Sequence, residues 1–113
     1  MATKKPAKLV ANDTWTRAWR LTAAGRPLDL TGASARLHLR DAHGVKVAEA
    51  STADGRLTLD GPAGRLDLTM PAAVMALPPG AYRYALEITD AEGQVRTVET
   101  HTLILLADVT DGD

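Results

Sequence analysis

Histidine side chains are the residues of this chain that come closest to a metal-binding set. Imidazole nitrogen is a preferred ligand of zinc and similar ions, and the chain offers His38, His43 and His101. No cysteine accompanies them, and no His-Glu-x-x-His spacing occurs. His38 falls on the polar face of an alternating segment, and His43 falls in a turn sequence. The pattern therefore favours histidines without a metal, and we expect no cofactor.

The last acidic residues of the chain, Asp108, Asp111 and Asp113 around Gly112, have the oxygen-rich composition of a calcium-binding loop. Their spacing differs from that of an EF-hand, and no glutamate follows to act as the bidentate ligand. Short acidic segments are usually solvated. We therefore interpret residues 111–113 as an acidic tail.

Serines and carboxylates, which serve elsewhere as nucleophiles and acid–base groups, form no catalytic pattern. Ser34 and Ser51 are the only serines, and neither lies in a nucleophile-elbow sequence. Asp67 and Glu87 could meet across strands, but outward charged pairs of this kind are usually solvated. The sequence predicts no catalytic residue, and we expect the protein not to be an enzyme.

Tyrosines suggest a second function, a ligand-binding module that recognises carbohydrate. Tyr82 and Tyr84 could stack against a sugar, but they share the phase of Leu86 and Ile88. Aromatic residues in phase with aliphatic ones normally bury together. Carbohydrate recognition therefore stays as the alternative, and it requires rings that are exposed.

The composition limits the classes of partner. The chain has 113 residues, no cysteine and a formal net charge of −1, which indicates one domain without disulfides. A nucleic-acid or membrane surface would normally show a basic excess, so we expect neither partner. The apolar run after the basic start is only residues 9–11, far shorter than a signal-peptide core.

Glycine-containing turn sequences divide the chain into short segments of alternating apolar and polar residues. About seven such segments, without a βαβ rhythm, predict an all-β fold, an antiparallel immunoglobulin-like β-sandwich, with a barrel as the second choice. One short helical segment is expected near residues 71–77, after Pro71. The expected strands cover residues 14–22, 33–40, 45–50, 56–60, 65–69, 80–89 and 94–106. In the segment 45–50, the odd-numbered positions are taken as the apolar ones, which face the core.

The same segments predict the domain organisation and the core. Residues 1–11 are expected to form a mobile N-terminal arm and residues 12–110 the sandwich. The predicted core shares one phase within successive segments. Its members are Trp15, Trp19, Leu37, Leu39, Leu66, Leu68, Tyr82, Tyr84, Leu86 and Ile88.

Several motifs along residues 12–110 carry a family likeness. They are Asp13-Thr14, Gly25-Arg-Pro-Leu-Asp-Leu-Thr-Gly-Ala33, Asp54-Gly55, Leu77-Pro-Pro-Gly-Ala-Tyr82, Glu92-Gly93 and Asp108-Val-Thr110. Their order resembles small prophage-encoded structural proteins and the N-terminal immunoglobulin-like domain of tailed-phage upper baseplate proteins. The resemblance implies a structural or assembly role in a tail or baseplate. It also implies a location in the cytoplasm of the bacterial host during assembly, and then in the virion.

The last predicted strand ends in four consecutive apolar residues, Leu103, Ile104, Leu105 and Leu106. A half-buried strand needs an apolar residue only at every second position, so both faces of this end are expected to leave water. These residues are the candidate interface, with another phage structural protein or a second copy as partner. Alternatively, the loop at residues 71–79 or the residues Leu9 and Val10 could cover them.

Overall fold

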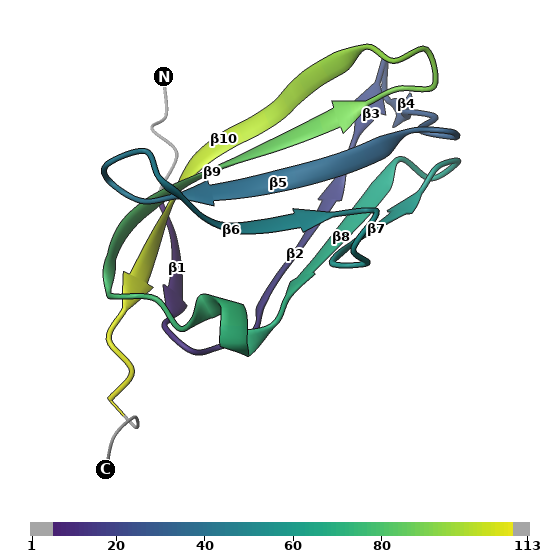
Figure 1. Ribbon diagram of the computed structural model, residues 1–113. Coiled ribbons are helices and arrows are strands. Elements are labelled where there is room, and N and C mark those ends of the chain that lie inside the picture. Colours follow the sequence, from purple (N-terminus) through teal and green to yellow (C-terminus); the bar gives the residue numbers. More distant parts are fainter. Residues whose placement is uncertain (1–5, 110–113) are drawn as a thin grey trace.

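Two facing β-sheets form the computed structural model, which describes residues 6–109. The five-stranded sheet has the order β1 (Ala7–Val10), β10 (Val95–Leu106), β9 (Gly80–Thr89), β5 (Ser34–Arg40) and β6 (Lys46–Ser51). The three-stranded sheet has the order β2 (Trp15–Arg20), β8 (Arg65–Met70) and β7 (Leu57–Asp60). Figure 1 shows the smaller sheet lying across one face of the larger one. The predicted tail, residues 111–113, lies outside the described residues.

Small elements complete the sandwich. The two-residue strands β3 (Thr22–Ala23) and β4 (Arg26–Pro27) pair as a hairpin, and a 3-10 turn, η1 (Ala72–Met75), follows β8. This turn is the short helical segment expected near residues 71–77. The described residues thus contain the seven predicted strands, together with β1, β3 and β4. No helix in this part of the chain is long and apolar enough to cross a membrane.

Alternation along the strands builds the core between the sheets. Strand side chains point to opposite faces in turn, so every second residue of each long strand enters the interior. All ten predicted core residues are buried. Further buried residues include Leu30, Leu57, Met70, Met75, Leu103 and Leu105. The core prediction is therefore confirmed.

Strand β6 presents the face opposite to the one predicted. The odd positions were expected to face inward, but Ala48 and Ala50 are buried, whereas Val45 is 57% exposed. The register explains this, because Leu37 pairs with Ala50 and Leu39 with Ala48, and buried residues share a face with their partners. An irregularity between Leu39 and Arg40 shifts the pairing near the turn. Such a shift by one residue exchanges the two faces of a strand.

The N-terminal segment also differs from its prediction. Residues 1–11 were expected to be an arm outside the sandwich, but Ala7–Val10 forms β1, which pairs in parallel with Leu103–Leu106. The backbone of Ala11 continues this contact by donating to the carbonyl oxygen of Leu106 at 2.9 Å. The physical reason is that the apolar end of β10 offers an unpaired backbone edge, which β1 satisfies. Residues 1–5 of the predicted arm lie outside the described residues.

Candidate functional site

A polar cluster lies between the sheets, where β2 faces β9 and β10. The hydroxyl group of Tyr84 donates to Oε1 of Glu99 at 2.5 Å, and Nη1 of Arg17 donates to the Tyr84 hydroxyl oxygen at 2.5 Å. Nη1 of Arg17 is also 3.4 Å from Oε1 of Glu99. The indole N–H of Trp19 donates to the other carboxylate oxygen at 3.3 Å. The Glu99 side chain is only 13% exposed, so these donors stabilise a carboxylate that is mostly removed from water.

A β-bulge places Glu99 in this cluster. Thr97 pairs with Glu87 on the outer face, and simple alternation would turn Glu99 to the same face. The register shifts between Thr97 and Glu99, so Glu99 instead pairs with the buried Leu86. Glu99 was not among the predicted site residues, although counting back in steps of two from the buried Leu105 and Leu103 reaches it. Arg17 did give a signal, as the one polar residue among the inward positions of its strand.

The cluster places a protonated tyrosine beside a carboxylate. Burial raises the pKa of Tyr84 to about 12, and its hydrogen bond to Glu99 adds to this effect. The phenol therefore keeps its proton at neutral pH and serves as a donor. Among the described residues, Glu99 accepts from Tyr84 and Trp19 and lies 3.4 Å from Arg17.

Aromatic rings surround this cluster inside the core. The ring of Tyr84 meets Trp15 edge-on with a centroid distance of 5.2 Å, and it meets His101 edge-on at 5.9 Å. Trp15, Trp19, Tyr82 and Tyr84 are each at most 6% exposed. These rings therefore offer no exposed platform on which a sugar could stack.

The three histidines lie in different places. His38 is on the outer face of the larger sheet, 3.2 Å from Glu49, whose pKa is lowered first by Lys46 and then by His38. His43 lies in the turn after β5, where its backbone N–H donates to Asp41. His101 meets the ring of Tyr84 edge-on. No group of three histidine, aspartate or glutamate residues within residues 6–109 is arranged to hold a metal ion.

The acidic residues considered from the sequence are also separated. Asp67 of β8 pairs with Arg65 at 3.0 Å in the smaller sheet, whereas Glu87 of β9 pairs with Arg36 at 2.8 Å in the larger sheet. Asp67 and Glu87 therefore do not meet, because the two strands belong to different sheets. Asp108 accepts from Nδ2 of Asn12 at 3.2 Å. Asp111 and Asp113 lie outside the described residues.

The two serines lie on the larger sheet. Ser34 begins β5 and is exposed. Ser51 ends β6, and its hydroxyl oxygen accepts the backbone N–H of Asp54 at 3.1 Å. This bond closes the turn after β6, which gives Ser51 a structural role.

The predicted interface divides into two faces. Leu103 and Leu105 point into the core and are at most 2% exposed, so they cannot contact a partner. Their burial corrects the expectation for these two positions. Ile104 is half-buried on the outer face, and Leu106 is 42% exposed. A role for these two residues in binding stays a prediction.

A long free strand edge lies beside them. Strand β10 spans Val95–Leu106, but β1 pairs only with Leu103–Leu106. Within residues 6–109, the segment 95–102 therefore has β9 on one side and no strand on the other. Val95 is 59% exposed and Val98 is 36% exposed along this segment. Backbone donors and acceptors of such an edge are available to another chain.

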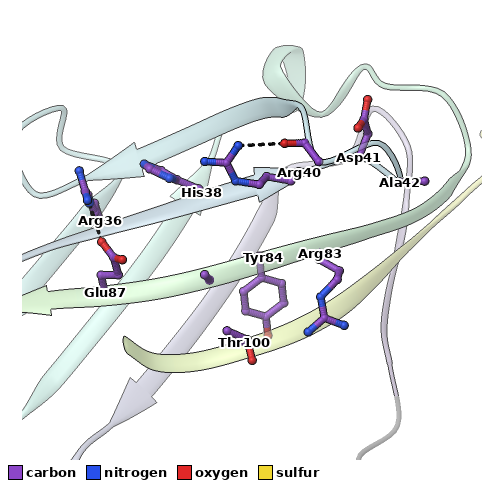
Figure 2. Close-up of a pocket in the computed structure, with 11 residues that line it drawn as sticks. Arg36, His38, Arg40, Asp41, Ala42, Arg83, Tyr84, Glu87 and Thr100 are labelled. Atoms are coloured by element: carbon purple, nitrogen blue, oxygen red, sulfur yellow. Dashed lines mark hydrogen bonds and ion pairs between the residues drawn. The ribbon is translucent and has the colours of Figure 1, made fainter. Parts of the chain in front are cut away.

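A hollow on the outer face of the larger sheet carries several basic side chains (Figure 2). It has a volume of about 410 Å³ and is lined by Arg36, His38, Arg40 and Arg83, together with the carboxylates Asp41 and Glu87. Strands β5 and β9 position these residues by alternation, since the intervening residues Leu37 and Leu39 fill the core. Alternation in the sequence puts Arg36, His38, Arg40 and Arg83 on outward positions, but which of them lie together depends on the pairing of β5 with β9.

Comparison with known proteins supports the fold. No family model matches the chain, and no curated protein matches its sequence. The solved structure of CopC from Methylosinus trichosporium OB3b is similar, with a TM-score of 0.54 and 15% sequence identity. The match covers 92% of this chain and 86% of that chain. At this identity the likeness concerns the fold alone, and this chain has an immunoglobulin-like β-sandwich fold.

Proposed function

We propose that this chain is a non-enzymatic structural or assembly protein of a phage or prophage particle, acting as a protein-interaction module of the tail or baseplate. The observation that carries the interaction role is the free edge of β10 at residues 95–102. An extended segment of a partner can add a strand to such an edge, and main-chain hydrogen bonds then supply affinity. The exposed Val95, Val98 and Leu106 add apolar contact area along the same strand.

The particle role is supported by the motifs that resemble phage proteins, and these motifs shape the fold. Asp29 accepts from both the backbone N–H and the hydroxyl of Thr31, which turns the chain before β5. The Tyr82 hydroxyl donates to the carbonyl oxygen of Pro78 at 2.6 Å, which fixes the start of β9. These contacts explain why a family with this fold would keep those residues.

Carbohydrate recognition is the weaker alternative. It requires exposed rings, and Trp15, Trp19, Tyr82 and Tyr84 are buried. The interaction role requires only exposed backbone and apolar side chains, which β10 provides.

The particle role is tested in the strain that carries this gene. Prophage induction is followed by electron microscopy and mass spectrometry of purified particles, with the intact gene, with a deletion, and with a Val95→Lys, Val98→Lys variant. We expect the deletion to abolish complete tails and the variant to reduce their number, because charge on this edge disfavours strand addition. A Thr58→Lys variant, on an exposed position of β7, is the matched control. Complete, infectious particles from the deletion strain would refute the proposal.

A further inference from the structure

Two arginines on the outer face of the larger sheet face each other without a carboxylate between them. Arg40 of β5 and Arg83 of β9 are register partners, and both are exposed. Like charges directly opposite each other on one face destabilise a sheet. Within residues 6–109, neither guanidinium forms an ion pair, whereas Arg36 on the same face is 2.8 Å from Glu87. The Arg40–Arg83 pair therefore leaves positive charge unneutralised.

The surroundings of the pair favour an external anion. Asp41 is the carboxylate next to Arg40 in sequence, but it accepts the backbone N–H groups of His43 and Val45 at 2.9 and 3.0 Å. Asp41 thus closes the turn after β5 and forms no ion pair with Arg40. Two guanidinium groups without an ion-pair partner attract carboxylates or phosphates, because the guanidinium fork matches the geometry of both, and the chain itself supplies carboxylates.

The shape of the hollow leaves room for such a group. Nη1 of Arg40 donates to the carbonyl oxygen of Gly44 at 3.0 Å, which holds this side chain at the rim. Figure 2 shows the Arg83 side chain running the other way, toward β10 and Thr100. Ala85, a small residue, also lines the hollow of about 410 Å³. An extended peptide carrying carboxylates fits the open space between the two guanidinium groups.

We propose that this hollow binds the acidic C-terminal segment of a second copy of the chain, through Asp111 and Asp113. The inference rests on the proposed function, because it names the partner that an assembly module would use. Each copy then offers a basic hollow and an acidic segment at different places. A contact between unlike surfaces of identical chains continues from copy to copy and gives rings or filaments.

The position of the segment favours a second copy over its own hollow. Strand β10 ends at Leu106, and residues 107–109 continue beyond the sheet (Figure 1). Arg83 pairs with Thr102, which precedes that end, so a segment returning to its own hollow would have to reverse its direction. Nδ2 of Asn12 also holds Asp108 at 3.2 Å, at the start of the segment. A segment that enters the hollow of a neighbouring copy does not have to reverse its direction, and the bond between Asn12 and Asp108 does not hinder it.

Sedimentation equilibrium of two charge-reversed proteins tests this arrangement. One protein is Arg40→Glu, Arg83→Glu, and the other is Asp111→Lys, Asp113→Lys. We expect the wild type to form oligomers at low salt and high concentration, and each variant alone to associate at least about tenfold more weakly. In an equimolar mixture association should return, because the intact hollow of one variant meets the intact segment of the other and the two reversed surfaces also carry opposite charges. The control Arg20→Glu, Arg26→Glu changes two exposed arginines elsewhere and should associate like the wild type.

Several outcomes would overturn the proposal. A wild type that stays monomeric, or a mixture that shows no return of association, would exclude the contact between copies. Binding is measured separately by NMR titration with a synthetic peptide of residues 106–113, with inorganic phosphate and with a short DNA oligonucleotide. Shifts near Arg40 and Arg83 with phosphate or DNA but not with the peptide would also refute it. If self-association fails while gene deletion still abolishes particles, the hollow inference is wrong and the particle role stands.

Discussion

Tyr84 connects the two sheets through both its ring and its hydroxyl group, whereas its position in the alternating strand predicts only that it is buried. Its ring contacts Trp15 and His101, and its hydroxyl group joins Arg17 to Glu99. A Tyr84→Phe substitution keeps the ring but removes the shortest donor to a carboxylate that is 13% exposed. We expect a loss of about 1–3 kcal/mol in the free energy of unfolding, because a partly buried acceptor loses its partner. Urea denaturation measures this loss, and a change below about 0.5 kcal/mol would contradict it.

The raised pKa of Tyr84 also predicts how stability depends on pH. The folded chain holds this proton up to a pKa of about 12, whereas an unfolded tyrosine releases it near its ordinary value of about 10. The stabilisation is therefore complete below about pH 10 and is lost as the pH rises toward 12. We expect the urea midpoint to fall between pH 9 and 11.5, and to fall less in Tyr84→Phe, which isolates this group from the other alkaline titrations. Equal slopes for the two proteins would count against the assignment.

At the level of elements, the turn between β7 and β8 supports the hairpin β3–β4. The carbonyl oxygen of Gly64 accepts the backbone N–H of Leu21 at 2.8 Å. A Cβ atom on Gly64 would lie 2.6 Å from the carbonyl oxygen of Leu21 and 2.7 Å from that of Leu28, and the φ angle is +63°. Gly64→Ala therefore combines backbone strain with a collision against backbone atoms.

The loss of stability caused by this collision can be separated from backbone strain by comparison with a second glycine. Gly55 has a φ angle of +80°, but its Cβ would meet nothing within 4 Å. Gly55→Ala should show only the strain of a positive φ, on the order of 1 kcal/mol, and Gly64→Ala should lose about 1–3 kcal/mol more. Thermal unfolding of both variants gives the comparison. Equal losses would mean that the loop around Leu21 and Leu28 moves aside freely.

The strands also show which parts of the fold can be predicted from patterns in the sequence. Strands with clean alternation, such as β5 and β9, were predicted with the correct face, because burial of apolar side chains decides both the strand and its register. The face of β6 was wrong, since both its odd and its even positions carry apolar residues, and the pairing of Ala48 and Ala50 with buried leucines of β5 decides which face enters the core. Glu99 was missed although it shares the inward phase of Leu103 and Leu105, because the bulge gives residues 95–97 the opposite phase and obscures the alternation. The hollow depends on β5 and β9 being neighbours, and pairing between distant segments leaves no local signal.

At the level of the whole molecule, β1 decides how much of the β10 edge remains open. Deleting residues 1–10 would extend the free edge from 95–102 to 95–106 and would uncover Leu105, which is 2% exposed in the intact sheet. We expect the melting temperature to fall by on the order of 5 °C, because the chain loses four strand residues and the cover of its core. We also expect aggregation that rises with concentration, since a longer apolar edge recruits other chains. Deleting residues 1–5 alone, which keeps β1, is the matched control, and light scattering during heating follows both proteins. If the longer deletion melts and scatters like the control, β1 contributes nothing to closing the sheet, and residues 1–11 behave as the mobile arm that the sequence predicted.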